Sequence, residues 1–173
     1  MGFTAFFFAA RQGHIAVVRA LLKAGIDVNQ SMEPQKPSGR GPGRGTSALL
    51  LAVENGHYEL ALALLDAGAD PNDQRSGFAP LHVMSWVRKP PRGEDKGAPP
   101  PPELGKIGSL QFIRELVKRG ADVNLRLANG SGGLGKFTTK GATPFLMAAS
   151  TADVPYLKLL LELGADPALA NAD

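Results

Sequence analysis

The hydrophobic positions along the chain predict eight short helices arranged in four pairs. In the second helix of each pair, apolar residues stand at positions i, i+1, i+4 and i+5, which lie along one side of a helix. The four sets are Val17, Val18, Leu21 and Leu22; Leu60, Ala61, Leu64 and Leu65; Phe112, Ile113, Leu116 and Val117; and Tyr156, Leu157, Leu160 and Leu161. Helices shorter than about 12 residues are marginal alone in water. The pattern therefore predicts an all-α fold in which successive helix pairs stack.

The same short sequence follows every predicted second helix. A glycine, which is typical of a left-handed helix end, is followed two residues later by Asp and in three cases then by Asn. These sites are Gly25-Ile-Asp27, Gly68-Ala-Asp70, Gly120-Ala-Asp122 and Gly164-Ala-Asp166, with Asn29, Asn72 and Asn124 after the first three. Gly13-His14 and Gly56-His57 separate the helices of the first two pairs. In the fourth pair we expect Asp153 to cap the second helix, with Pro155 in its first turn.

These recurring landmarks resemble the ankyrin repeat. The resemblance covers most of the chain, in segments 4–29, 47–72, 79–124 and 143–167. Ala79-Pro-Leu-His82 and Thr143-Pro-Phe-Leu146 are similar to the Thr-Pro-Leu-His start of that repeat. The resemblance implies a solenoid of four helix-turn-helix repeats with hairpin-like finger loops. We expect residues 1–173 to form a single ankyrin-repeat domain.

The ends of this domain are predicted to lack caps, because the terminal repeats keep apolar residues where a cap would be polar. These residues are Phe6, Phe7 and Phe8 in the first repeat, and Leu159, Leu160, Leu161 and Leu163 in the fourth. We therefore expect either a longer array or ends that are covered by another subunit.

Three segments lengthen the ankyrin period of about 33 residues. Thr4 and Ser47 are 43 positions apart, Ser47 and Ala79 are 32 apart, and Ala79 and Thr143 are 64 apart. The extra residues fall in segments rich in Gly and Pro, which predicts long loops. These loops are the first finger (33–45), the third finger (129–141), and an insert between the two helices of the third repeat (88–107).

Composition and charge narrow the functional classes. The absence of cysteine excludes disulfides and thiolate metal sites. The net charge of +3 is concentrated in the loops, since segments 30–46, 88–107 and 125–142 carry +2, +2 and +3 and leave −4 elsewhere. No apolar run approaches the roughly 20 residues of a membrane helix. No basic residue precedes the apolar stretch at Phe6–Ala10, so we recognise no signal peptide and expect a cytoplasmic location if this is the full chain.

Histidines and aspartates recur once per repeat, which argues against catalytic or metal sites. The resemblance implies that His14, His57 and His82 bond to loop backbone, and Asp followed by Asn after a glycine is ordinary turn chemistry. No nucleophile-elbow or phosphate-loop motif is present. We expect no enzyme activity, no cofactor and no metal.

The resemblance implies instead a protein-binding surface on the concave side, formed by the ends of the first helices and by the fingers. The residues expected there are Arg11, Gln12, Glu54, Asn55, Arg75, Phe78, Trp86, Val87, Lys136 and Phe137. Two interpretations of Trp86 remain open: it is a binding hot spot, or it anchors the insert that begins at Arg88. The partner protein is not identified by the sequence.

Two alternative functions belong to other classes. Basic loop residues suggest nucleic-acid or polyanion binding as an alternative, which the salt dependence of binding would test. These residues are Arg40, Arg44, Lys136 and Lys140. The uncapped ends suggest a structural role, in which the array stacks on neighbouring subunits or on further repeats.

Overall fold

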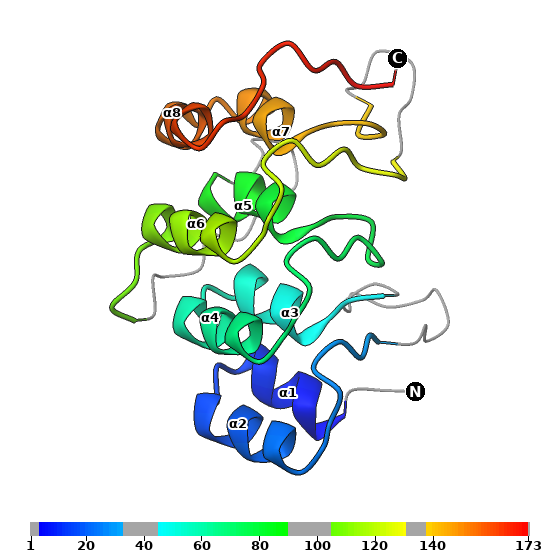
Figure 1. Cartoon of the computed structure of the whole chain (residues 1–173), viewed down its shortest axis with the longest axis vertical. Coiled ribbons are helices and arrows are strands. Elements are labelled where there is room, and N and C mark those ends of the chain that lie inside the picture. Colours follow the sequence, from blue (N-terminus) through cyan, green and yellow to red (C-terminus); the bar gives the residue numbers. More distant parts are fainter. Residues whose placement is uncertain (1–3, 33–44, 90–104, 131–137, 173) are drawn as a thin grey trace, which may run out of the picture.

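The protein is a single column of four stacked helix pairs, and the turns that join successive pairs lie on one side of it (Figure 1). We analysed a computed structural model that describes residues 4–32, 45–89, 105–130 and 138–172. Within these ranges the chain forms eight helices and no strand beyond one isolated bridge between Ser31 and Ser47. The pairs are α1 (Ala5–Arg11) with α2 (Ile15–Lys23), α3 (Ala48–Glu54) with α4 (Tyr58–Asp66), α5 (Pro80–Arg88) with α6 (Ser109–Lys118), and α7 (Pro144–Ser150) with α8 (Val154–Glu162).

Hydroxyl side chains start three of the four first helices. Thr4, Ser47 and Thr143 each accept a hydrogen bond from the backbone N–H three residues later, at 3.3–3.4 Å. Such caps satisfy N–H groups that have no partner inside the helix. In the third repeat Ala79 takes this position, and Pro80, which lacks an N–H, begins α5.

The predicted helix ends are confirmed. The glycines after α2, α4, α6 and α8 have positive φ angles between 92° and 98°, as a left-handed terminator requires. Asp153 caps α8 by accepting the N–H of Tyr156 at 3.2 Å, and a proline lies in the first turn of that helix. Inside the pairs, Gly13 and Gly56 also have positive φ, whereas the fourth repeat places Ala152 there with φ 52°.

The core runs continuously through the column between successive pairs. Tyr58 of α4 stacks on Phe112 of α6 with ring centroids 4.8 Å apart, which joins the second and third repeats. In the inner repeats the predicted stripes are buried except for Val117, which is half-buried. Val17 and Leu161 are exposed, because no described pair covers the outer side of the terminal repeats.

The expectation about the ends is wrong for most of the residues named. Phe6, Phe7, Leu159 and Leu160 are buried, because they face the inside of their own pair or the adjacent repeat. Leu163 is half-buried, so the exposed large residues among those named at the two ends are Phe8 and Leu161.

The fingers have hairpin-like stems in the described residues, as predicted. In the first finger, Met32 donates to the carbonyl of Thr46, and Gly45 donates back to Met32, both at 2.9 Å. In the third, Leu127 and the segment Gly141–Ala142 exchange equivalent bonds at 3.0 and 2.8 Å. The outer parts of both loops lie outside the described residues.

The insert of the third repeat is attached at both ends to neighbouring repeats. At its start, Arg88 pairs with Asp153 at 2.8 Å, and Lys89 Nζ donates to the Ala152 carbonyl at 2.8 Å. At its end, the backbone N–H of Lys106 donates to Glu59 of α4. Residues 90–104 lie outside the described part of the chain.

Candidate protein-binding surface

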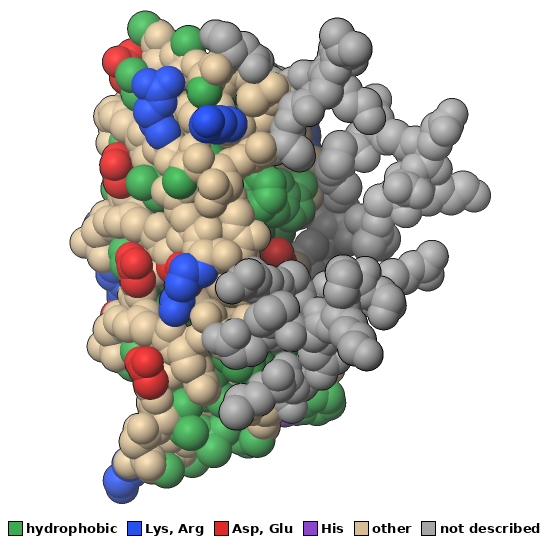
Figure 2. Space-filling model, turned by 90° about the vertical axis from the view of Figure 1, so that its right-hand side faces the viewer, with side chains coloured by type: hydrophobic (Ala, Val, Ile, Leu, Met, Phe, Trp, Pro, Cys, Tyr) green, Lys and Arg blue, Asp and Glu red, His purple; other side chains and the backbone are tan. Residues whose placement is uncertain are grey.

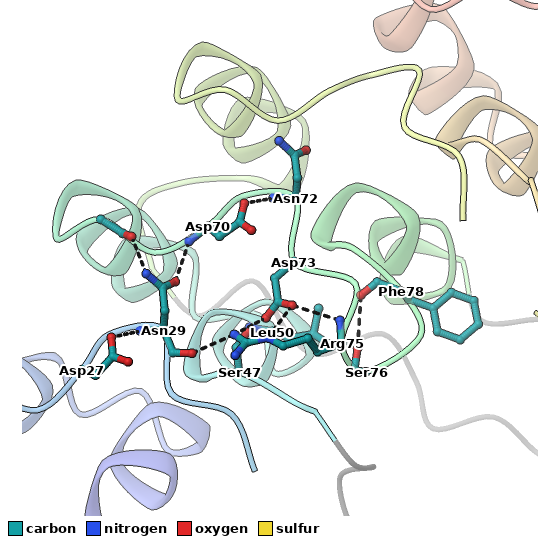
Figure 3. Close-up of polar contacts among 11 residues, drawn as sticks. Asp27, Asn29, Ser47, Leu50, Asp70, Asn72, Asp73, Arg75, Ser76 and Phe78 are labelled. Carbon is teal, nitrogen blue, oxygen red and sulfur yellow. Dashed lines mark hydrogen bonds and ion pairs between the residues drawn. The ribbon is translucent and has the colours of Figure 1, made fainter. Parts of the chain in front are cut away.

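A ladder of asparagine side chains fixes the spacing of the turns from which the fingers extend, and Figure 3 shows the first of them, Asn29, with its two bonds to the second repeat. Asn29 Nδ2 donates to the Gly68 carbonyl at 2.9 Å, and Asn29 Oδ1 accepts the N–H of Asp70 at 2.9 Å. Asn72 makes the same two bonds to the third repeat, and Asn124 makes them to the fourth. Each bond satisfies a turn backbone group of the next repeat, so the ladder sets the register of the whole finger side.

Arg75 joins the second finger to the first repeat. Its guanidinium makes a two-pronged contact with Asp73 at 2.8 Å and donates to the Asn29 carbonyl at 2.7 Å (Figure 3). The hydrogen bond with Asp73 raises the pKa of Arg75 above its ordinary value. The Arg75 side chain is 46% exposed while that of Asp73 is 8% exposed, so Arg75 still presents part of its surface to solvent.

Phe78 and Trp86 form an aromatic pair where the second finger meets α5. Their ring centroids are 4.9 Å apart with an interplanar angle of 81°, an edge-to-face arrangement that aromatic pairs favour. Both rings are half-buried and pack on a small core made by Leu127, Ala142 and Met147. On the face that holds the fingers, Figure 2 shows a hydrophobic patch at the height of the third repeat.

Glu54 ends α3, at the repeat position that Trp86 occupies in α5. It is half-buried, and burial raises the pKa of its carboxyl group. Within the described residues its carboxylate makes neither an ion pair nor a hydrogen bond. Because α3 and α5 pack side by side, this carboxylate lies one repeat from the aromatic pair.

Comparison with known families decides the identity of this architecture. A model of ankyrin repeats in three copies matches residues 1–75, and a model of the ankyrin repeat matches residues 140–172. The chain belongs to the ankyrin repeat family. A search of curated proteins found no match. Ankyrin repeats generally serve as protein–protein interaction modules and are generally not enzymes.

The ankyrin models leave residues 76–139 unmatched, and this segment holds the third repeat. The structure nevertheless places a complete helix pair there, α5 with α6, in register with the others. The unmatched repeat also carries the features that set this chain apart: the Phe78–Trp86 pair, the insert after Arg88, and the third finger.

The other expected surface residues of the ankyrin array, besides Glu54, Arg75, Phe78 and Trp86, fall into three groups. Arg11, Gln12 and Lys140 are exposed, and Asn55 is half-buried, with its Nδ2 donating to the Leu51 carbonyl at 2.8 Å. Val87 requires a correction, because it is only 5% exposed and its side chain belongs to the core. The third group lies outside the described residues and comprises Arg40, Arg44, Lys136 and Phe137.

Histidines and aspartates behave as structural residues of the family. His57 Nε2 donates to the Arg11 carbonyl at 3.1 Å, and His82 Nε2 faces the carbonyls of Leu125 and Ala142 at 3.1 and 3.2 Å. Burial lowers the pKa of His82 to about 4. His14 is exposed.

Each Asp after a terminal glycine accepts the backbone N–H two residues later at 2.8–2.9 Å, which confirms the turn interpretation. In the described ranges no three His, Asp or Glu side chains converge as a metal site would require. Among the helices described, none has the length and hydropathy to cross a membrane.

Sequence reasoning missed the contacts that fix Trp86. Its partner Phe78 was grouped with the same surface, but nothing in the sequence linked the two rings to Leu127 and Met147, which lie at least 41 positions from Trp86. It also assigned Arg88 to the insert. Arg88 is the last residue of α5 and attaches the start of the insert to the fourth repeat, since its guanidinium pairs with Asp153 and lies 6.0 Å from the ring centre of Tyr156.

Proposed function

We propose that this ankyrin array is a non-catalytic module that binds a protein through the surface formed by the ends of its first helices and by its fingers. The observation that carries the proposal is the half-buried Phe78–Trp86 pair on the finger side. A large aromatic residue that is held rigidly by its neighbours loses little side-chain entropy on binding, which is why Trp is frequent among hot spots.

The surroundings of the pair suggest the chemistry of the partner. Phe78 and Trp86 offer an apolar contact, and Glu54 offers a partly desolvated carboxylate one repeat away. Burial removes part of the hydration of this carboxylate, and a cation from the partner would compensate for that loss. We therefore propose a partner segment that carries an apolar side chain for the aromatic pair and a Lys or Arg for Glu54.

Arg75 has a different role in this proposal. Its guanidinium already contacts Asp73 and the Asn29 carbonyl, so it holds the second finger in place while its exposed part borders the site. The exposed residues Arg11 and Gln12 extend the same surface across the first repeat. Asn55 extends it across the second.

Selection from a displayed random-peptide library tests this proposal. The full chain and the Trp86→Ala variant serve as baits, with Leu161→Ala as the matched control, since Leu161 is an exposed apolar residue of α8. We expect the wild type and the control to enrich peptides that pair an apolar residue with Lys or Arg. The Trp86→Ala bait should lose them, and Glu54→Gln should reduce the preference for the cation. Equal enrichment by the Trp86→Ala bait would contradict the proposal, provided that both baits unfold at the same urea concentration.

Polyanion binding remains a competing proposal. It rests on Arg40, Arg44, Lys136 and Lys140, and only Lys140 is among the described residues, where it is exposed. If these residues grip phosphates, affinity for duplex DNA must fall with salt at a log–log slope of about −0.9 per phosphate contact. No detectable binding at low salt would dismiss this alternative.

A further inference from the structure

Equivalent positions in the four repeats show which side of each pair faces the repeat before it. The positions of Leu51 and Leu60 in the second repeat are buried in the second, third and fourth repeats, where every residue at them is 8% exposed or less. They stay buried in the fourth repeat even though no described repeat follows it. These positions are therefore covered by the preceding repeat.

The first repeat displays this backward face uncovered. Phe8 and Val17 occupy the positions of Leu51 and Leu60 and are 54% and 47% exposed. Ile26 occupies the position of Ala69 and is 37% exposed, whereas Ala69, Ala121 and Ala165 are 5–7% exposed. The residues at these positions are as apolar as those of an inner repeat, and the Gly-Ile-Asp turn is the bulkiest of the four. The face thus has the composition of a repeat interface.

The same face carries polar groups that inner repeats pair with the repeat before. The carbonyl of Gly68 and the N–H of Asp70 are bound by Asn29, and the equivalent groups of the first repeat belong to Gly25 and Asp27. Among the described residues no side chain reaches those two groups. His14 likewise occupies the position of His57, which donates to the helix end of the preceding repeat, and His14 is exposed.

The opposite end of the array has a different chemistry. Where three repeats carry the bridging asparagine after Asp, the fourth carries Ala168. Ala168 has no side-chain amide, so a repeat stacked beyond α7 and α8 would receive neither bond of the ladder. The two ends of the array therefore differ. The first repeat offers the backbone groups that a bridging asparagine binds, whereas the last repeat has no asparagine with which to bind a further repeat.

We propose that the backward face of the first repeat, defined by Phe8, His14, Val17, Ile26 and the turn at Gly25–Asp27, is a docking surface for another ankyrin repeat. The partner repeat presents the bridging asparagine to the Gly25 carbonyl and the Asp27 N–H, and it covers the three apolar side chains. A second copy of this chain is a poor occupant in the head-to-tail arrangement, because its forward face carries Ala168. This surface is separate from the Phe78–Trp86 site, and the proposed function stands or falls independently of it.

A fusion provides the test. Residues 47–78, which are one full repeat with Asn72, are placed directly ahead of Thr4 in the otherwise complete chain. We expect the melting temperature to rise by about 5 °C or more, because the new interface buries the exposed apolar face. Amide exchange at Asp27 should slow by about tenfold or more as its N–H gains an acceptor.

Two controls identify the cause of any gain. In the fusion, Asn72→Ala in the added repeat should abolish the slowing at Asp27 while keeping most of the thermal gain. The same residues 47–78 appended after Asp173 should give a smaller gain, since Ala168 makes no bridge. An equal rise in melting temperature for the fusions at both ends, or no rise for the fusion ahead of Thr4, would overturn the proposal.

A variant of the unfused chain covers the case in which the fusion misfolds. Val17→Ser should leave the melting temperature within about 2 °C of the wild type, because Val17 is exposed, whereas Leu60→Ser should lower it markedly. A large fall in melting temperature with Val17→Ser would show that the face is already covered and would contradict the proposal. Concentration-dependent dimerisation of the wild type that Val17→Ser abolishes would assign the face to a second copy instead.

Discussion

Asn124 spans the boundary between the third and fourth repeats by accepting the backbone N–H of Asp166 at 2.8 Å. Its other side-chain atom donates to the Gly164 carbonyl at 3.2 Å. The same pair of bonds recurs at Asn29 and Asn72, so one residue type at one position connects every pair of successive repeats. A polar ladder of this kind holds neighbouring turns in register while the apolar core supplies most of the burial.

Replacement of Asn72 by Ala should weaken the array. Two hydrogen bonds are lost, and the Gly120 carbonyl and Asp122 N–H remain at an exposed turn where water can partly replace them. We expect a loss of about 1–2 kcal/mol in the free energy of unfolding, measured by urea denaturation. The matched control is Ala168→Asn, which faces no described repeat and should be neutral within about 0.5 kcal/mol.

Ala152→Gly should stabilise the protein. Ala152 has φ 52°, a left-handed conformation that costs a residue with a Cβ about 1 kcal/mol relative to glycine. Gly13 and Gly56 hold the equivalent positions in the first two repeats with φ near 75°. Thermal and urea unfolding should both report a gain of up to about 1 kcal/mol. Gly56→Ala provides the reverse experiment, and a gain there or a loss at Ala152 would contradict the structural equivalence.

The repeat pattern made the architecture predictable from the sequence, because each landmark has a local cause. Thr4, Ser47 and Thr143 are hydroxyl caps, and the terminal glycines adopt a backbone that other residues avoid. Burial was harder to predict, since it depends on the neighbouring repeat. Leu159 and Leu160 are buried while Leu161 is exposed, although all three are leucines in one helix.

The sequence could predict which repeat positions form the candidate site, but not the contacts among their side chains. The register identified Trp86 and Glu54 as equivalent, but the cluster that supports Trp86 brings together three separate segments of the chain. Val87 was wrongly expected on the surface beside Trp86. It is the next residue along the helix, and its side chain points towards the core. Contacts at such sequence distance leave no periodic signal.

Breaking the ion pair between Arg88 and Asp153 is expected to lower the free energy of unfolding more than breaking an ion pair on the surface. Asp153 is fully buried and Arg88 is 14% exposed, and Asp153 also caps α8. Asp153→Ala leaves a buried guanidinium without its counter-charge, so we expect a loss of about 3–5 kcal/mol in unfolding free energy. Glu162→Ala is the control, because it removes an exposed pair with Arg114 and should cost less than about 1 kcal/mol. Similar losses for the two variants would contradict this account.

Acid should destabilise the protein partly through His82. Its Nε2 donates to the Leu125 and Ala142 carbonyls, and its Nδ1 is buried without a partner, so the folded state holds the neutral ring and its pKa is about 4. The unfolded ring has a pKa of about 6.5 and takes up a proton first as the pH falls. The contribution of His82 is therefore complete above pH 6.5 and is lost between about pH 6.5 and 4.

The magnitude of this effect can be measured by difference. A shift of this size corresponds to about 3 kcal/mol, at 1.36 kcal/mol per pKa unit. Urea unfolding of the wild type and of His82→Gln is compared at pH 7.5 and pH 4.5. Gln can donate a hydrogen bond but does not titrate in this range, so the variant should lose less stability on acidification. Identical pH dependence of the two proteins would show that His82 is not the responsible group.

The central claim is that Trp86 is the hot spot of a protein-binding surface, and one affinity ratio tests it most directly. Titration calorimetry measures the dissociation constant of a peptide selected by the wild type against the wild type, Trp86→Ala and Leu161→Ala, with the urea midpoint of each protein recorded alongside. A hot spot contributes about 2 kcal/mol or more, so Trp86→Ala should raise the dissociation constant by about 30-fold while Leu161→Ala leaves it unchanged. An unchanged dissociation constant in a Trp86→Ala protein that unfolds at the wild-type urea midpoint would contradict the claim.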